Sequence, residues 1–93
     1  MKTSGTNYSV LYEHSVIVDD IPKLSNRIKN TIQKAIQERL MLDPVSFGKP
    51  LRYSFKGHRR LRVGDYRIVY RIDASEYIVR IVAIKHHKDV YDD

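Results

Sequence analysis

The stretch that decides the fold is Arg59-Arg60-Leu61-Arg62-Val63-Gly64-Asp65-Tyr66-Arg67-Ile68-Val69-Tyr70-Arg71. Apolar and charged side chains alternate on both sides of Gly64-Asp65, which predicts two strands joined by a tight turn. If glycine supplies the positive φ at the first position of a two-residue turn, Val63 pairs with Tyr66 and Arg62 with Arg67. This register assigns every side chain of the hairpin to one of two faces.

The predicted hairpin has an apolar face and a basic face. We expect the apolar face to pack toward the helices with Leu61, Val63, Tyr66, Ile68 and Tyr70. The basic face gathers His58, Arg60, Arg62, Arg67 and Arg71. Like charges opposite each other destabilise a sheet, so the pattern favours an anionic ligand, although arginines on an open face also extend into water. Guanidinium groups suit phosphate, and such an array either binds a phosphate backbone or stabilises a pentacoordinate phosphorane.

Further strands surround the hairpin. Alternation at Tyr8, Val10 and Tyr12 indicates a first strand. After a turn at Phe47-Gly48-Lys49-Pro50, four successive strands are predicted at Leu51–Phe55, Arg59–Val63, Tyr66–Ile72 and Tyr77–Ile84, with turn residues at each junction. The predicted fold class is α+β, an antiparallel meander packed against an N-terminal pair of helices.

One helix is predicted from Ser25 to about Leu42. Its apolar positions recur every four residues, at Ile28, Ile32, Ile36 and Leu40. Ser25 is placed to cap its start, and Asp43-Pro44 should end it because the residue before proline is pushed out of helical geometry. Two alternatives remain for the preceding segment: Val16-Ile17-Val18 favours a strand, whereas Ile21 and Leu24 fit a short helix interrupted by Pro22.

Length and composition predict one domain over residues 1–93. With 42% apolar and 30% charged residues, the chain has the balance of a folded soluble protein. The absence of cysteine excludes disulfides, thiolate catalysis and Cys-ligated zinc. No apolar run is long enough for a membrane span or a secretory signal, so we expect a cytoplasmic protein with no membrane contact. Nothing in the sequence calls for a cofactor.

The formal charge of +6 is unevenly distributed. Residues 1–46 carry 6 Lys/Arg and 5 Asp/Glu, whereas residues 47–93 carry 11 and 6. Between Lys49 and Arg71 there are eight basic residues and one acidic residue, Asp65. This density would attract phosphate backbones or an acidic protein, or it forms a solvated face.

The run Ala83-Ile84-Lys85-His86-His87-Lys88-Asp89-Val90-Tyr91 adds imidazoles after the last strand. Two adjacent histidines lack the spacing of a metal site, so no metal is expected. A histidine close to arginines suits proton transfer, with an ordinary surface histidine as the alternative. Tyr91 either stacks on a base or seals the edge of the core.

Three segments resemble the RelE/ParE toxin superfamily: Asp43-Pro44 with Phe47-Gly48-Lys49-Pro50-Leu51, the string Arg60–Tyr70, and His86-His87-Lys88-Asp89-Val90-Tyr91. The last of these is similar to the family's His-Arg-Arg-Asp-Val-Tyr ending. The resemblance implies a type II toxin that is encoded with an antitoxin. It also implies ribosome-dependent cleavage of mRNA in the A site without a metal, in which the RNA 2′-hydroxyl attacks the neighbouring phosphate.

The resemblance also assigns roles by position. Arg67 corresponds to the arginine that stabilises the scissile phosphate, and Arg60 and Arg62 match positions that are basic in RelE-like enzymes. His86 is the candidate general acid, and Tyr91 matches a tyrosine that orients the substrate base. The remaining expected substrate-binding residues are His58, Lys56, Arg71 and Lys88, of which His58 or Lys56 would be the base because arginine is a poor one.

Two other functions compete with the ribonuclease. A ParE-like toxin would poison DNA gyrase by binding protein, with no chemistry on the basic face. A non-enzymatic nucleic-acid-binding module would explain the charge but not cause growth arrest. The expected partners are the ribosome, mRNA and a cognate antitoxin whose acidic residues neutralise Arg60, Arg62 and Arg67.

Overall fold

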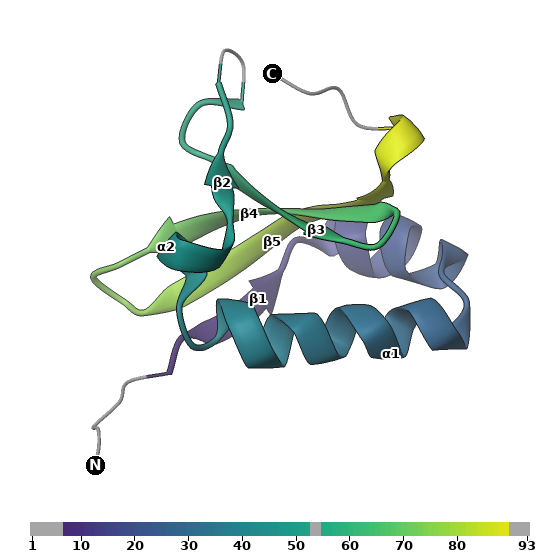
Figure 1. Cartoon of the computed structure of the whole chain (residues 1–93), viewed down its shortest axis with the longest axis horizontal. Helices are drawn as coiled ribbons and strands as arrows, with labels where there is room; N and C mark the ends of the chain where they lie inside the picture. Colours follow the sequence, from purple (N-terminus) through teal and green to yellow (C-terminus); the bar gives the residue numbers. More distant parts are fainter. Residues whose placement is uncertain (1–6, 53–54, 90–93) are drawn as a thin grey trace.

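The computed structural model describes residues 7–52 and 55–89 and has a five-stranded sheet with helices packed on one side (Figure 1). The elements in chain order are β1 Ser9–Tyr12, the π-helical turn η1 Val16–Asp20, the 3₁₀ turn η2 Ile21–Lys23, α1 Asn26–Ala35, the π-helical turn η3 Ile36–Leu40, α2 Pro44–Phe47, β2 Lys49–Pro50, β3 Arg59–Val63, β4 Tyr66–Asp73, β5 Ile78–His86 and the 3₁₀ turn η5 His87–Asp89. No helix within these ranges is long and apolar enough to cross a membrane.

The strand order is β1-β5-β4-β3-β2. The strands β2 to β5 pair antiparallel in sequence order, and β1 adds to the outer edge of β5 in parallel. The predicted α+β class is therefore confirmed. The parallel edge strand extends the meander beyond what local patterns indicated, because strands so far apart in sequence pair through the tertiary fold.

The segment before α1 is helical, so the strand alternative for Val16-Ile17-Val18 is wrong. Val16 and Asp20 are buried, whereas Ile17 and Val18 are exposed. Burial at positions four apart is helical periodicity, and packing under the sheet outweighs the β propensity of the branched residues. Pro22 stands in the first turn of η2, where a missing backbone donor costs nothing.

The predicted helix is confirmed at both ends. The Ser25 side chain accepts a hydrogen bond from the Ile28 backbone N–H (3.2 Å), and the helix runs through α1 and η3 to Leu40. Asp43 leaves helical geometry with φ −153° and caps α2 by accepting from the Ser46 N–H (3.2 Å). The Asp43-Pro44 signal thus ends one helix and begins another.

The strand predicted over Leu51–Phe55 is wrong at Leu51, Arg52 and Phe55, and its other two residues lie outside the described ranges; the turn predicted at Phe47–Pro50 is also wrong. Within residues 7–52 and 55–89, strand pairing on this side of β3 is limited to Lys49 and Pro50, which form β2. Proline lacks a backbone donor and suits only such an edge position. The Leu51 N–H continues the pairing by donating to the His58 carbonyl (2.9 Å), and a turn with Gly57 at φ 92° leads back to β3.

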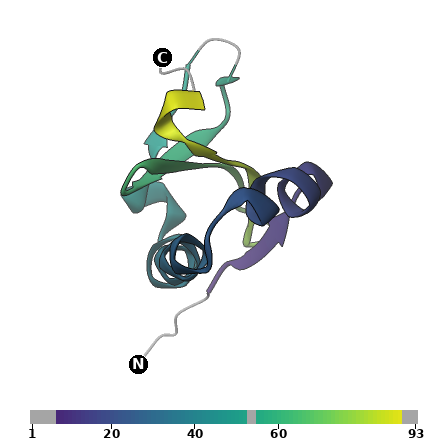
Figure 2. The ribbon, with the colours of Figure 1, turned by 90° about the vertical axis from the view of Figure 1, so that its right-hand side faces the viewer.

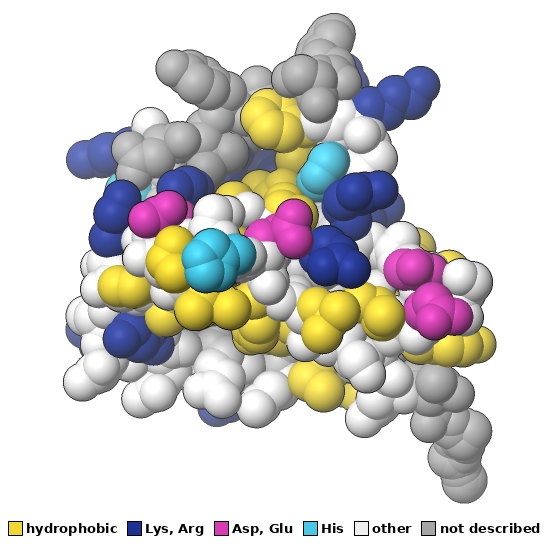
Figure 3. Space-filling view, turned by 180° about the vertical axis from the view of Figure 1, so that it is seen from behind, with side chains coloured by type: hydrophobic (Ala, Val, Ile, Leu, Met, Phe, Trp, Pro, Cys, Tyr) yellow, Lys and Arg dark blue, Asp and Glu magenta, His cyan; other side chains and the backbone are white. Residues whose placement is uncertain are grey.

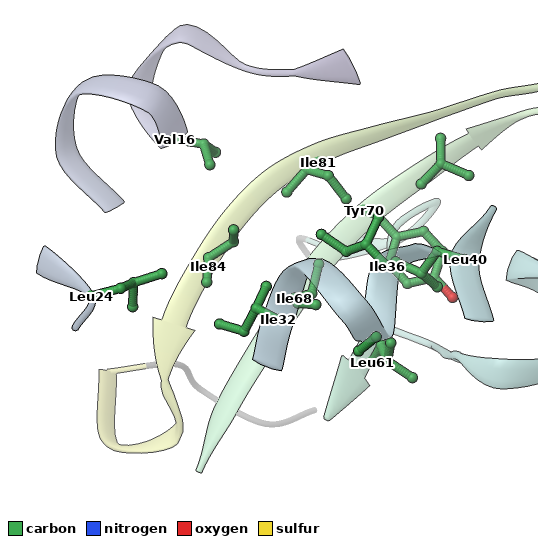
Figure 4. Close-up of a cluster of buried hydrophobic side chains, with 12 residues drawn as sticks. Val16, Leu24, Ile32, Ile36, Leu40, Leu61, Ile68, Tyr70, Ile81 and Ile84 are labelled. Carbon is green, nitrogen blue, oxygen red and sulfur yellow. The ribbon is translucent and has the colours of Figure 1, made fainter. Parts of the chain in front are cut away.

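The core lies between α1, η3 and the helix-facing side of the sheet (Figures 2 and 4). Its buried members include Val16, Leu24, Ile32, Ile36, Leu40, Leu61, Ile68, Tyr70, Ile81 and Ile84. The predicted apolar hairpin residues all pack in or against this cluster. One face of the β3–β4 hairpin therefore packs against the helices, and its other face, which carries the predicted basic residues, points away from them.

Candidate functional site

The observed hairpin has the register expected from its turn. Val63 lies opposite Tyr66, Arg62 opposite Arg67 and Leu61 opposite Ile68. Gly64 has φ 59°, a conformation that glycine adopts without strain. Two arginines therefore face each other on the side of the sheet away from the core.

Arg67 is the most enclosed cation of the basic face. Its exposed fraction is 6%, whereas Arg62 opposite it is exposed and donates from Nε to the Gly64 carbonyl (3.1 Å). Burial, followed by the charges of Arg60 and Arg62, lowers the pKa of Arg67. An anion that approaches a guanidinium held in this way stabilises its charged form, because the anion offsets both the desolvation and the repulsion from the neighbouring charges.

The strand β5 adds two cations that the sequence reasoning missed. Arg80 lies opposite Arg71, and Lys85 lies opposite Arg67. A β-bulge shifts the register between Val69 and Tyr70. Counting outward from the turn without this bulge would place Ile84 opposite Arg67, so only the bulge brings Lys85 to that position. The alternation of charged and apolar residues in β5 could have indicated these two cations, but such a pattern does not reveal a bulge.

A buried carboxylate secures this end of β5. Asp20 is 4% exposed and accepts hydrogen bonds from the Ile84 N–H (2.9 Å) and from Lys85 Nζ (2.7 Å). The parallel partner β1 ends at Tyr12, opposite Ile81, so the Ile84 N–H lies beyond the paired part of this edge. Asp20 therefore takes the place of a neighbouring strand and fixes Lys85.

His86 stands at the end of β5, beside the basic face. It lies opposite Tyr66, so the register alone places it on the helix-facing side rather than with Arg67. Its ring meets Tyr66 edge-on (centroids 5.3 Å apart) and stacks on His87 (4.6 Å). The Nδ1 atom accepts from the Lys88 backbone N–H (3.2 Å), which assigns the proton of the neutral ring to Nε2.

The turn η5 extends the site over the outer side of the sheet. The turn and the chain after β2 both rise on the side opposite α1 (Figures 1 and 2). The His87 N–H donates to the Asp65 carbonyl (2.7 Å), which ties η5 to the hairpin turn. Lys88, also in η5, is exposed. The basic face is thus flanked by both segments.

The remaining candidate residues are more scattered. His58 is half-buried just before β3, and its Nδ1 is buried without a hydrogen-bond partner within residues 7–52 and 55–89. Lys56 and Arg71 are exposed. Tyr91 lies outside the described residues. In the described part of the chain, no three His, Asp or Glu side chains gather closely enough to hold a metal ion.

The rear surface of the molecule, turned by 180° from the view of Figure 1, is mixed in charge. Seen from behind, acidic side chains are interspersed with Lys and Arg above a band of hydrophobic side chains (Figure 3). Exposed apolar residues of β1 and η1 include Leu11, Ile17 and Val18. This rear surface therefore carries charges of both signs, whereas Arg60, Arg62 and Arg67 share the outer face of the sheet.

Comparison with known proteins points to one family. Residues 11–91 match the family described as "ParE toxin of type II toxin-antitoxin system, parDE". Toxin RelG of Mycobacterium tuberculosis is 36% identical over 72 residues, 77% of this chain and 83% of RelG. Toxin RelE of the same bacterium is 33% identical over 72 residues, 77% of this chain and 74% of that protein.

Solved structures agree with this relationship. A chain of the RelBE toxin–antitoxin complex of M. tuberculosis superposes with a TM-score of 0.82 at 32% identity, covering 90% of this chain and 95% of that chain. A chain of the archaeal RelE–RelB complex of Pyrococcus horikoshii shares the fold, with a TM-score of 0.68 at 19% identity and coverage of 90% and 99%. Because the family match and relatives above 30% identity span most of its length, the chain belongs to the RelE/ParE family of type II toxin–antitoxin toxins.

Proposed function

We propose that this toxin is a ribosome-dependent endoribonuclease that cleaves messenger RNA in the A site. The observation that carries the proposal is the group of Arg60, Arg62 and Arg67 on one sheet face, where burial and then the two neighbouring charges lower the pKa of Arg67. Such a cluster is stabilised by an anion, and a phosphodiester matches the paired donors of guanidinium groups. The two relatives named as Rel toxins support the same choice.

The proposed reaction is an intramolecular transfer at phosphorus. A base removes the proton from the 2′-hydroxyl, the 2′-oxygen bonds to the adjacent phosphorus, and the bond to the 5′-oxygen of the next nucleotide breaks. An acid then protonates that leaving oxygen. The products are a 2′,3′-cyclic phosphate and a free 5′-hydroxyl. Arg67 and Arg62 oppose the negative charge that builds on the phosphorane.

The proton transfers are assigned to two histidines. His86 is the proposed acid and acts as the imidazolium, whose two ring nitrogens both carry protons, so the hydrogen bond from the Lys88 N–H to Nδ1 is given up and Nε2–H donates to the leaving oxygen. His58, half-buried just before β3, is the proposed base because an imidazole can take up a proton, which the neighbouring arginines cannot. Lys56, exposed on the preceding turn, is the second candidate for the base.

The other candidate residues hold the substrate. Arg60, Arg71 and Lys88 are proposed to bind phosphates on either side of the cleaved bond, where their exposed or half-buried positions leave room for a strand. Tyr91 is proposed to orient the base. Because the proposed substrate is mRNA on the ribosome, we place the toxin in the cytoplasm.

An acidic antitoxin is the proposed protein partner. Two of the similar structures are complexes of a toxin with its antitoxin, which supports a partner of this kind. A segment rich in Asp and Glu would neutralise Arg60, Arg62 and Arg67 and so block the site. Coexpression with the neighbouring open reading frame should then abolish toxicity, and removal of that segment's acidic residues should restore it.

The second candidate function is inhibition of DNA gyrase. It is favoured by the description of the matching family, which is named for ParE. A third candidate, a nucleic-acid-binding module, predicts RNA binding without cleavage or growth arrest. The test adds purified toxin to a translating extract and, separately, to a gyrase supercoiling assay. Cuts within the A-site codon support the ribonuclease, whereas intact mRNA with blocked supercoiling assigns the toxin to the gyrase class.

A further inference from the structure

A cavity of about 350 Å³ lies at the free edge of β3. Its lining residues are Arg39, Phe47, Lys49, Arg60, Leu61 and Arg62, and we call it the Phe47 pocket. The strand β2 pairs only with Arg59 and Arg60, so Leu61 and Arg62 border the pocket without a strand on that side in the described part of the chain. Four of the six lining side chains are cationic, none is acidic, and one is aromatic.

Phe47 is exposed on a rigid support. Its exposed fraction is 49%, although it ends the short helix α2 whose neighbours are firmly held. Arg59 Nη2 donates to the carbonyls of Val45 (2.6 Å) and Gly48 (2.8 Å), on either side of Phe47. The Tyr70 hydroxyl donates to the Pro44 carbonyl (2.6 Å) from inside the core. A ring mounted in this way loses little conformational freedom when a ligand stacks on it.

We propose that the Phe47 pocket binds one nucleotide of single-stranded RNA beside the cleaved phosphate. The base stacks on Phe47, and Arg39 with Lys49 holds the phosphate of that nucleotide. Aromatic rings beside cations are the usual means of binding a single strand without sequence preference, because every base has a flat face and every nucleotide a phosphate. This inference rests on the proposed function and extends it to a substrate subsite at the margin of the basic face.

The pocket is continuous with the proposed catalytic cluster. Arg60 and Arg62 line it and also belong to the basic face, about 7 Å apart along β3 from the usual strand rise. A strand whose cleaved phosphate lies near Arg67 would pass these two arginines to reach Phe47. An acidic peptide would satisfy the cations but would leave the exposed ring without a planar partner, so we favour RNA.

Tryptophan fluorescence gives a direct test because the chain contains no tryptophan. The Phe47→Trp variant places a single reporter in the pocket, and Val45→Trp places one on the same helix at a residue that is 55% exposed and does not line the pocket. The probe is a 2′-O-methylated single-stranded oligonucleotide, which binds without being cleaved. Inorganic polyphosphate and polyglutamate serve as anions that have no bases.

Stacking predicts that the oligonucleotide quenches the Phe47→Trp protein and leaves the Val45→Trp protein unchanged. Polyphosphate should compete for binding without quenching. The Phe47→Ala variant should bind the oligonucleotide about tenfold more weakly. Arg39→Gln should bind several-fold more weakly with a smaller salt dependence, while Arg27→Gln, an exposed site on α1, should match the unmodified chain.

Two results would overturn the subsite. One is undiminished oligonucleotide binding by Phe47→Ala, and the other is equal quenching by polyglutamate, which would assign the pocket to an acidic protein. If the unmodified toxin cleaves mRNA while Phe47→Ala binds and cleaves equally well, the subsite alone is wrong. If the unmodified toxin cleaves nothing but oligonucleotide quenching persists, the proposed function is wrong, and the pocket is a binding site for single-stranded RNA with no cleaved phosphate beside it.

Discussion

Arg62 and Arg67 lie directly opposite each other on β3 and β4, one pair away from the turn that fixes their register. Arg67 is buried and Arg62 is exposed, so the pair combines an enclosed guanidinium with one that is accessible to a ligand. Like charges at such a position cost stability, typically up to about 1 kcal/mol. Because the pair lowers the stability of the fold, replacing one of the two arginines should affect activity and stability in different ways.

Replacing Arg62 should therefore impair activity without destabilising the fold. In Arg62→Gln, lost repulsion offsets the lost hydrogen bond to the Gly64 carbonyl, so the free energy of unfolding should change by less than about 1 kcal/mol. Cleavage in the translating extract should nevertheless fall at least tenfold. Urea titration checks the first statement and primer extension the second. Unchanged cleavage would remove Arg62 from the site.

Asp20 should be essential for stability because it is buried and accepts two hydrogen bonds at the edge of β5. Asp20→Ala leaves the Ile84 N–H without its acceptor and should lower the free energy of unfolding by about 2–4 kcal/mol. Asp20→Asn keeps one acceptor oxygen, so its free energy of unfolding should fall by less than that of Asp20→Ala. The exposed neighbour Asp19 provides the control, since Asp19→Ala should unfold like the unmodified chain. Equal losses for the Ala and Asn variants would contradict the edge-capping role.

Tyr70 should make the fold sensitive to alkaline pH. Burial raises its pKa above the usual 10.0, so the folded chain holds the phenolic proton more tightly than the unfolded chain does. This stabilisation is complete below pH 10.0 and is lost as pH rises through the folded-state pKa. Burial also raises the pKa of Tyr12, which acts in the same window.

The free energy of unfolding should thus decline above pH 10.0, and less steeply in Tyr70→Phe. At neutral pH this variant should also lose about 1–2 kcal/mol, because the Pro44 carbonyl loses its buried donor. The exposed Tyr77 gives the matched control. A Tyr70→Phe profile parallel to that of the unmodified chain would contradict this assignment.

Gly48 should tolerate no side chain, because of space rather than backbone conformation. Its φ of −101° is open to any residue, but an added Cβ would lie 1.7 Å from the Tyr70 hydroxyl oxygen. Gly48→Ala should lower the thermal midpoint, and Tyr70→Phe in the same chain should restore part of the loss. Simple additivity of the two substitutions in calorimetry would count against this contact.

The hairpin and the basic residues of β3 and β4 were predictable because a two-residue turn fixes its own register. The helix ends at Ser25 and Asp43-Pro44 were predictable for a similar reason, since capping and the restriction before proline act over a few residues. Where a structural signal is local, the sequence pattern alone was sufficient.

The parts that were missed depend on distant contacts. Lys85 reaches its position opposite Arg67 through a bulge, and β1 pairs with a strand that follows almost seventy residues later. The predicted strand after Pro50 failed because pairing with β3 stops there. Phe47 was missed because it was assigned to a turn, whereas it ends α2 and lines a pocket with four cations from other elements.

The central claim is that Arg67 stabilises the phosphorane, and the most direct measurement is the amount and chemistry of mRNA ends in a translating extract. Unmodified toxin should produce cuts in the A-site codon that end in a 2′,3′-cyclic phosphate. Arg67→Ala should produce at least about a hundredfold fewer, as expected on removal of a transition-state donor, while remaining folded by circular dichroism. Arg27→Ala should cleave normally. Equal cleavage by folded Arg67→Ala would contradict the account.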